Sequence, residues 1–309
     1  MPEVARQGDK TACPVLFILP HVGGPLEPAG AVTLTADGKD VIRIGDYAHC
    51  RAPNPLDVVF EGAACFTVCG IPVARKGDHM AHGGLIVEGS PTFIVGGPTW
   101  ALPANITISG PADFQNKTIR DMYMLSTLPS GQEMLNQLTA NGKPVSIEPE
   151  SDPHNSFCAP GFPWWDSQNG VGTGSTVKYN PDVAIWMYDD KWNEIGSPPQ
   201  LVLGHELIHA LHNSDGTNQG TDPDPNAPAS EPTIPKEEAY TIGTGSWDGT
   251  SPTENSMRSD LGLPRRDNHY GTDGLKREER QFLWFKWTEV TDRTNEVTAP
   301  TGDLRPGNC

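Results

Sequence analysis

The chain has 309 residues, of which 20% are charged, and its formal net charge is −17 at pH 7. The first hundred residues carry 7 basic and 10 acidic side chains, and the remainder carry 15 and 29. Such an acidic surface repels phosphate backbones and argues against a nucleic-acid partner. The length allows two domains, and 33 Gly with 30 Pro favour short strands, turns and loops over a helical bundle.

The sequence contains neither a predicted transmembrane helix nor a predicted signal peptide. A run of about 18 apolar residues, which a transmembrane helix needs, is not found in the sequence. The apolar run at 15–19 is too short for the core of a signal peptide. We therefore expect synthesis in the cytoplasm, and secretion without a cleaved leader if the protein leaves the cell. The six scattered cysteines then favour metal ligation or burial over disulfides.

One short phrase occurs three times in the first hundred residues, as VARQGDKTAC (4–13), VIRIGDYAHC (41–50) and VARKGDHMAH (73–82). Each copy contains Arg-x-Gly-Asp and places a Cys or a His four positions after the Asp. Strand-like runs broken by Gly and Pro lie between the copies, which indicates a β-repeat architecture. Because a unit of this size cannot bury a face alone, we expect the three copies to pack around a pseudo-threefold axis.

The residue that closes each copy predicts a metal site on this axis. Under threefold packing, the equivalent residues Cys13, Cys50 and His82 converge. Tetrahedral zinc takes four ligands, and His21 is the nearest further candidate. A zinc ion bound there would supply folding free energy where a small tapering domain has little core.

This segment resembles the PAAR-repeat family, the sharpened tips of type VI secretion spikes. The phrases VARQGD, VIRIGD and VARKGD and the ending HGGLIVEGSPTFIVGG carry the resemblance, which covers roughly residues 1–97. It implies an all-β cone with zinc at the apex and a base that binds a trimeric spike protein of the VgrG type. His49 and His79, which lie beside the repeated pattern, are alternatives to His21 as a ligand.

The stretch GGPTWALPAN (96–105) breaks the repeat, so we place a linker at 98–105 and a second domain at 106–309. Apolar residues then recur at helical spacing over 113–128. A second helix is expected over 130–142, with a Ser start signal and a Gly stop. The stretches KPVSIEP and STVKYNPD read as strands.

The segment SPPQLVLGHELIHALHNSDG (197–216) predicts a helix that carries chemistry. His205 and His209 are four residues apart and project from the same helical face, so both imidazoles can bind one Zn²⁺. Glu206 points about 100° around the helix, beside the metal. It can accept a proton from the zinc-bound water and pass it to the leaving amine.

A third zinc ligand must come from elsewhere in the chain. A metzincin would need Gly at 212 and His at 215, whereas this chain has His212 and Asp215. A downstream acid, the gluzincin solution, is offered by KEEAYTIG (236–243). We favour Glu238 as the ligand and keep Glu237 as the alternative.

The second domain resembles compact zinc metallopeptidase effectors of the NleD-like group. The resemblance rests on SGQEMLNQL, GHELIHALH, EEAYTIG and TENSMRSDLGLPRRDNHY, within about 130–270. It implies an α+β, zincin-like domain of the gluzincin type that hydrolyses peptide bonds of a protein in a target cell. A donor to the tetrahedral oxyanion is then expected in the last phrase. We favour Tyr270, with His269 and Arg258 as alternatives.

Together these features predict a type VI secretion effector, a toxin of interbacterial competition that carries a zinc peptidase on the spike tip. An immunity protein is a further expected partner if the target is bacterial. Two other functions are compatible with the motifs. One is a peptidase of peptidoglycan cross-bridges, and the other is a non-catalytic, structural spike tip. An intact Glu206 argues against the structural reading, because a purely structural metal site needs no base there.

Overall fold

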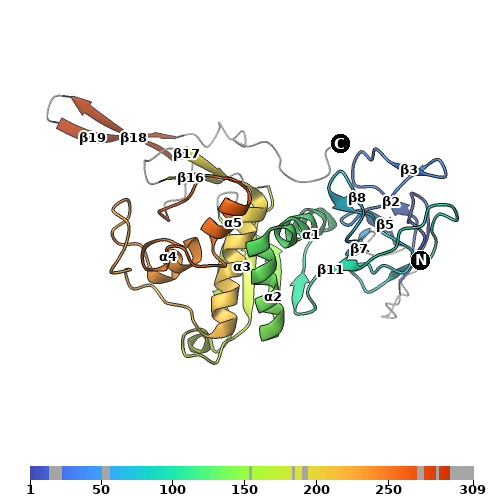
Figure 1. The fold of residues 1–309 in the computed structure, drawn as a ribbon, viewed down its shortest axis with the longest axis horizontal. Coiled ribbons are helices and arrows are strands. Elements are labelled where there is room, and N and C mark those ends of the chain that lie inside the picture. Colours follow the sequence, from blue (N-terminus) through green and yellow to red (C-terminus); the bar gives the residue numbers. More distant parts are fainter. Residues whose placement is uncertain are drawn as a thin grey trace. The chain divides into compact units, whose positions relative to one another are not determined.

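The computed structural model describes residues 1–13, 23–50, 56–152, 155–182, 185–189, 194–269, 275–282 and 285–292. By its internal packing the chain divides into two compact units, residues 1–124 and a second unit that begins at Leu125. Figure 1 shows the course of the chain through both. In the described parts, no helix has the length and hydropathy needed to cross a bilayer. The domain limits inferred from the sequence, 1–97 and 106–309, stay a prediction.

The first unit consists mainly of short strands joined by tight turns. Strands β2, β5 and β6 form one antiparallel sheet, and the pairs β1–β10, β3–β4, β7–β11 and β8–β9 are also antiparallel. The strands are β1 (Thr11–Ala12), β2 (Leu26–Glu27), β3 (Thr35–Ala36), β4 (Lys39–Asp40), β5 (Tyr47–His49), β6 (Leu56–Val58), β7 (Glu61–Ala63), β8 (Thr67–Val68), β9 (Ile71–Pro72), β10 (Leu85–Ile86), β11 (Thr99–Ala101) and β12 (Ile106–Ile108). The prediction of short strands over this region is confirmed.

The three copies of the repeated phrase meet in a closed ring of backbone hydrogen bonds. The amide of Ala5 donates to the carbonyl of Ala74 (2.9 Å), and the amide of Ala74 donates to the carbonyl of Ile42 (2.8 Å). The amide of Ile42 donates back to the carbonyl of Ala5 (2.9 Å), which closes the ring. All three residues are fully buried in one hydrophobic cluster. A ring of this kind is what threefold packing of three repeats produces.

The Arg-x-Gly-Asp phrase itself encodes a turn. In each copy the amide of the Asp donates to the carbonyl of the Arg, and the Asp side chain accepts from the Arg amide. The Gly has φ between +80° and +96° in each copy, as the third position of a type II turn requires. The Arg and Asp side chains also form an ion pair, which is fully buried in the second copy. The three pairs are Arg6–Asp9, Arg43–Asp46 and Arg75–Asp78.

The second unit combines helices and sheets. Helix α1 (Ala112–Thr127) ends in it, and its own elements are α2 (Pro129–Asn141), β13 (Val145–Pro149), β14 (Phe157–Pro160), η1 (Trp164–Gln168), β15 (Ser175–Tyr179), β16 (Ile185–Tyr188), β17 (Glu194–Ser197), α3 (Pro199–Asp215), α4 (Lys236–Ile242), η2 (Gly245–Trp247), α5 (Glu254–Asp260), β18 (Leu275–Phe282) and β19 (Phe285–Asp292). The helices expected over 113–128, 130–142 and 197–216 and both expected strands are confirmed. The start signal at Ser130 is wrong, because α2 begins one residue earlier, at Pro129.

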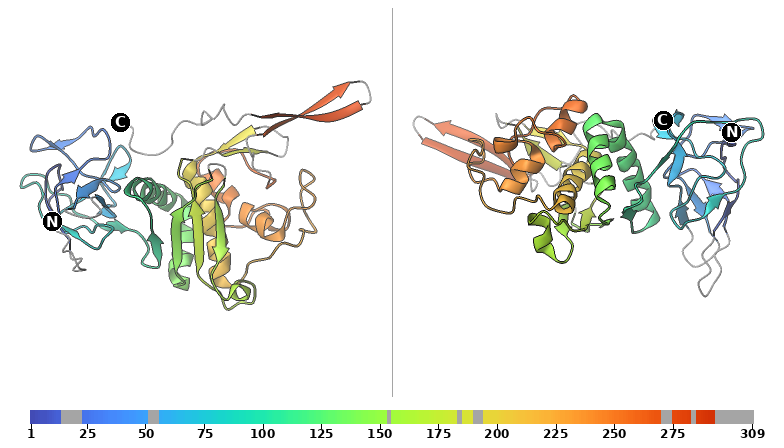
Figure 2. Two further views of the ribbon diagram at one scale, coloured as in Figure 1. Left: turned by 180° about the vertical axis from the view of Figure 1, so that it is seen from behind. Right: turned by 60° about the horizontal axis from the view of Figure 1, so that its bottom comes forward.

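Helix α3 occupies the centre of this unit. Strand β15 lies between β13, which is parallel to it, and β14, which is antiparallel. Helix α3 packs against β14 and β15, and α2, α4 and α5 pack against α3 (Figure 2). Residues 200–214 of α3 are all buried. Polar side chains of α3 therefore lie in the interior of the unit and need partners there.

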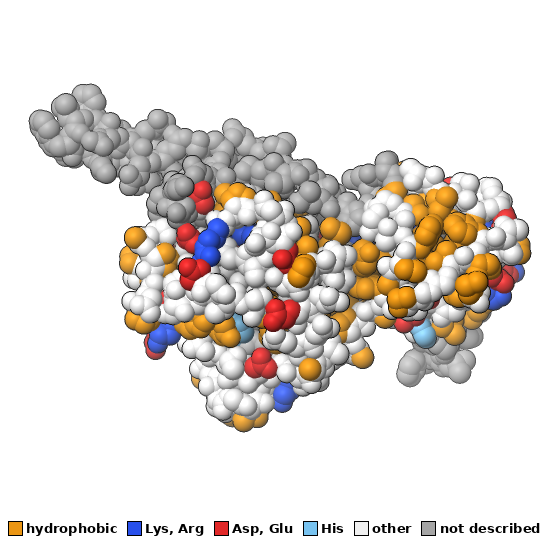
Figure 3. Space-filling view, in the orientation of Figure 1, with side chains coloured by type: hydrophobic (Ala, Val, Ile, Leu, Met, Phe, Trp, Pro, Cys, Tyr) orange, Lys and Arg blue, Asp and Glu red, His pale blue; other side chains and the backbone are white. Residues whose placement is uncertain are grey.

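Hydrophobic side chains gather on the face of the first unit that Figure 3 shows, whereas the same view of the second unit is mostly polar with scattered apolar groups. Exposed apolar surface of this kind is typical of proteins that bind other proteins.

We predict that Gly45→Ala destabilises the first unit more than Gly77→Ala. Both glycines have positive φ, which costs alanine about 1–2 kcal/mol. A methyl group at position 45 would also lie 2.7 Å from Arg120 Nε and 3.1 Å from the Asn116 carbonyl, whereas position 77 opens to solvent. Hydrogen exchange of the full-length chain should show earlier opening of residues 41–46 in Gly45→Ala. Equal effects of the two substitutions would contradict this account.

Candidate active site

Helix α3 carries His205 and His209, and its ends explain why it forms here. Pro199 occupies the first turn, where its missing amide hydrogen costs nothing. Gly216 ends the helix with φ +73°, and its amide donates to the carbonyls of His212 and Asn213. Between these ends the two imidazoles lie one turn apart on one face, with ring centroids 4.9 Å apart.

Helix α4 brings a carboxylate to the same point. His205 Nε2 lies 3.3 Å from Glu238 Oε2, and His209 Nε2 lies 3.5 Å from Glu238 Oε1. One ligand atom from each of the three residues falls within 4.8 Å of the others. Glu238 Oε2 is buried and has no hydrogen-bond partner. Two imidazole nitrogens and a carboxylate oxygen are the donor set of a catalytic zinc site.

The far nitrogens of both imidazoles are held by two further glutamates. His205 Nδ1 lies 2.8 Å from Glu254 Oε2, and His209 Nδ1 lies 2.8 Å from Glu237 Oε1. A carboxylate can only accept, so each Nδ1 carries the hydrogen and each Nε2 lone pair is directed to the cluster. Carboxylates in this position typically orient metal-binding histidines. The residues therefore fit a zinc ion.

The two outer glutamates are fixed in turn by other residues. Glu254, on α5, accepts from Arg258 Nε at 2.8 Å and from Arg266 Nη1. Glu237 also accepts from His212 Nδ1 at 2.8 Å. The His212 ring stacks on Tyr240 with centroids 3.8 Å apart and an interplanar angle of 7°.

Charge at the centre of the site favours a cation. Burial lowers the pKa of His209, but Glu238 and Glu237 raise it, and the net pKa is well above its ordinary value. Burial likewise opposes ionisation of Glu237, yet hydrogen bonds from His209 and His212 bring its pKa down to about 2. The pKa of Glu238 also falls well below its ordinary value, because the neighbouring imidazoles outweigh its burial. Glu237 and Glu238 are therefore ionised, and a metal ion bound by the imidazoles would replace the protons that these carboxylates favour.

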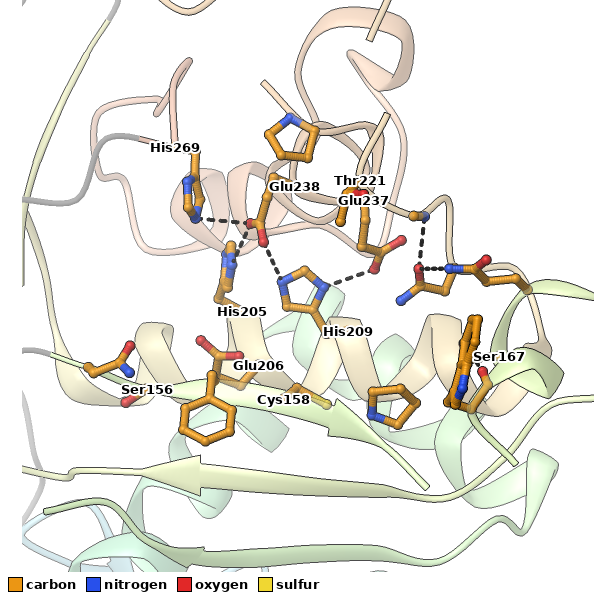
Figure 4. A pocket seen from close by; sticks show the side chains of 18 residues that line it. Ser156, Cys158, Ser167, His205, Glu206, His209, Thr221, Glu237, Glu238 and His269 are labelled. Atoms are coloured by element: carbon orange, nitrogen blue, oxygen red, sulfur yellow. Dashed lines mark hydrogen bonds and ion pairs between the residues drawn. The ribbon is translucent and has the colours of Figure 1, made fainter. Parts of the chain in front are cut away.

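Glu206 lies beside the cluster and is 6% exposed. It lines the same cavity as His205 and His209, and Figure 4 shows its carboxylate between the histidines and Cys158. Burial raises the pKa of Glu206, although the neighbouring imidazoles oppose the rise. A carboxylate with a raised pKa is a better proton acceptor than an exposed one.

The cavity has a volume of about 460 Å³ and runs between α3 and strand β14. Figure 4 shows Ser156 toward one end and Ser167 toward the other, with Glu206 and Cys158 between them. Its wall therefore combines the ligand cluster, the side chains of β14 and those of η1.

The residues proposed as oxyanion donors have different positions. His269 lines the cavity, with Nε2 3.4 Å from Glu238 Oε2, and burial lowers its pKa to about 4. Arg258 is fully buried, bonded to Glu254 and to the carbonyls of Gly196 and Pro264. Tyr270 lies outside the described residues.

The family models identify both parts of the chain. Residues 19–88 match the PAAR motif, and residues 103–270, more than half of the chain, match the peptidase M91 model, described as effector protein. The chain belongs to the peptidase M91 family. The M91 match includes α3, α4 and α5, which hold the histidine cluster. This protein thus joins a PAAR part to an M91 effector part.

Solved structures similar to this M91 protein are distant. The neurotoxin serotype F light chain of Clostridium botulinum shares 18% identity over 44% of this chain and 45% of its own, with a TM-score of 0.35. The botulinum neurotoxin serotype HA light chain shares 19% sequence identity over 49% of each chain, with a TM-score of 0.37. The M91 protein thus spans about half the length of these structures. A search of curated proteins found no match.

In the PAAR part, four side chains form a second group that could hold a metal. Cys13, Cys50 and His82 lie together with Asp57, with one ligand atom from each within 4.8 Å of the others. Burial, with Asp57 and Cys13 nearby, raises the pKa of Cys50 to about 12. His21 lies outside the described residues.

Neither alternative to His21 is among these four residues. His49 and His79 pair with Glu27 and Glu61 on the surface.

Sequence reasoning missed two contributors. Asp57 lies in β6, between two copies of the repeat, so no periodic position marks it. Glu254 is the second residue of the segment TENSMRSDLGLPRRDNHY, in which the sequence predicted only an oxyanion donor. Its spacing of four residues from Arg258 signals an ion pair but not the bond to His205.

We predict that Glu254→Gln and Glu237→Gln each weaken zinc binding at the histidine cluster by about 10- to 100-fold. The charge that supports each imidazole is lost while the shape of the side chain is kept. Competition with a chromophoric chelator, in a Cys50→Ala background that removes a ligand of the other group, measures the affinity. Glu148→Gln, on the sheet surface, is the matched control. If Glu254→Gln binds zinc like this control, Glu254 does not support His205.

Proposed function

We propose that this M91 protein is a type VI secretion effector whose C-terminal part is a zinc-dependent peptidase. It hydrolyses peptide bonds of a protein in the recipient cell. The observation that carries the proposal is the convergence of His205, His209 and Glu238, with both Nδ1 atoms held by carboxylates and Glu206 alongside.

The ligand set supports a specific division of labour. His205, His209 and Glu238 would hold a zinc ion, which would supply Lewis acidity for a carbonyl group and for a water molecule. Glu206 accepts the proton of the attacking water and delivers it to the leaving amine. Tyr270 donates a hydrogen bond to the oxyanion. The residue that precedes it in the sequence, His269, lines the cavity.

The PAAR part supports delivery. Its base binds the trimeric spike protein, and its apex holds a second zinc ion at Cys13, Cys50 and His82, with His21 or Asp57 completing the set. The protein is made in the cytoplasm and carried into the recipient cell on the spike. An immunity protein protects producing bacteria where the target is bacterial.

We predict that Glu206→Gln lowers the rate of peptide cleavage by about 10²- to 10⁴-fold, because the general base is lost. The bound zinc should remain, since Glu206 is not among the three ligands. Cleavage of a denatured protein mixture, followed by mass spectrometry, measures the rate, and Glu148→Gln serves as the control. Unchanged cleavage by Glu206→Gln would exclude Glu206 as the general base, whereas no cleavage by the wild type would favour a non-catalytic spike tip.

We predict two zinc ions per wild-type chain and one in each of His205→Ala and Cys50→Ala. Each substitution removes one ligand from one of the two separate groups. Elemental analysis of the purified full-length proteins measures the content. A single zinc that is lost only in Cys50→Ala would leave the apex site standing and remove the basis for a zinc peptidase.

A further inference from the structure

An exposed aromatic surface adjoins the candidate active site. It consists of Phe157, Phe162, Trp164 and Trp165, which are 42%, 87%, 57% and 48% exposed. Three of the rings pack edge to face, with Phe162 and Trp165 centroids 5.5 Å apart and those of Trp164 and Trp165 6.0 Å apart. Clustered exposed aromatic side chains usually mark a binding surface.

This aromatic surface is continuous with the cavity of the ligand cluster. Phe157 and Trp164 line the same cavity as His205 and Glu206, with Pro160 between them along the chain. A polypeptide whose scissile bond lies at Glu206 therefore places a neighbouring side chain against these rings.

The segment that carries the rings is fixed to the end of helix α3. The amide of Gly170 donates to the carbonyl of Gly216, and the amide of Thr173 donates to that of Asn213, both at 2.9 Å. A Cβ atom at Gly216 would lie within 2.7 Å of Gly170, so the two backbones are in direct contact. The aromatic surface is thus formed before any substrate binds.

Several polar groups near the rings bond within the segment, and Gln168 Nε2 donates to Asn218 Oδ1 outside it at 3.4 Å. Asn169 Nδ2 donates to Asp166 Oδ1 at 2.9 Å, and Asn169 Oδ1 accepts from the Val171 amide. Ser167 Oγ donates to the Trp164 carbonyl at 2.7 Å. A sugar would need such groups for its hydroxyls, whereas an apolar side chain needs only the rings.

We propose that the aromatic surface binds a bulky aliphatic or aromatic side chain of an extended protein segment, and thereby selects the peptide bond that is cleaved. The proposal rests on the proposed peptidase function and names its substrate class. Peptides of the cell wall carry small or charged side chains, so contact with this surface would add little to their binding free energy. The occupant is therefore a segment of a protein.

The test is a cleavage profile of the zinc-loaded full-length chain on a library of peptides derived from proteins. We expect Phe, Tyr, Trp, Leu or Met at one fixed position relative to the cleaved bond. Trp164→Ala should lower kcat/KM for a matching peptide roughly tenfold or more, chiefly through KM. For the same peptide with Ala at that position, kcat/KM should differ less than about threefold between Trp164→Ala and the wild type. Val171→Ala, which is exposed on the same segment but lies outside the cavity lining, is the matched control.

The outcomes separate the two proposals. If the wild type cleaves no peptide, the proposed peptidase function fails and this inference falls with it. If peptides are cleaved without the apolar preference, or Trp164→Ala behaves like Val171→Ala, only this inference is overturned. A third outcome is that the wild type releases fragments from purified peptidoglycan and Trp164→Ala does not, while peptide selectivity is unchanged. The rings would then bind the cell wall, and this inference would be overturned as well. Zinc content equal to that of the wild type shows that Trp164→Ala is folded.

Discussion

The hydrogen bonds from the Nδ1 atoms of His205 and His209 to Glu254 and Glu237 are the constraint on which the site depends. Helix α3 is buried along almost its whole length, so the Nδ1 atoms of its imidazoles, which point away from Glu238, need partners inside the unit. These partners come from α5 and α4, at sequence separations of 49 and 28 residues. The ligand geometry therefore exists only when the three helices are packed together, and folding and metal binding are coupled.

The first unit is held together mainly by contacts between its three repeats. Its strands are two or three residues long, too short to hold one another in place as an ordinary sheet does. Instead, the ring of hydrogen bonds through Ala5, Ile42 and Ala74 joins the three repeats. The Arg-x-Gly-Asp turns set the direction of the chain after each of these residues. In the second copy both charges are buried, and Arg120 on α1 adds a further bond to Asp46 at 3.0 Å. The repeats thus share the Arg-x-Gly-Asp phrase but differ in the burial of its charged side chains.

Local patterns in the sequence predicted the elements well. Helical spacing placed α1 and α3, a Gly stop signal marked the end of α2, and the strands β13 and β15 were also predicted, because these signals depend on neighbouring residues. The fourfold spacing of His205 and His209 also required no tertiary information. The support from Glu254 and the approach of Asp57 to Cys13 could not be foreseen, since both depend on how distant segments pack. The choice between Glu237 and Glu238 was similarly open in the sequence. In the structure these adjacent side chains lie at opposite nitrogens of one imidazole.

The backbone contact between Gly170 and Gly216 joins the segment with the aromatic rings to the helix that carries the histidines. With no side chain between them, the two segments have little freedom to move apart. This backbone contact therefore sets the position of the segment relative to the helix that carries Glu206. Under the proposed function, a substrate side chain held by the rings would set which peptide bond reaches Glu206, at a fixed number of residues along the substrate.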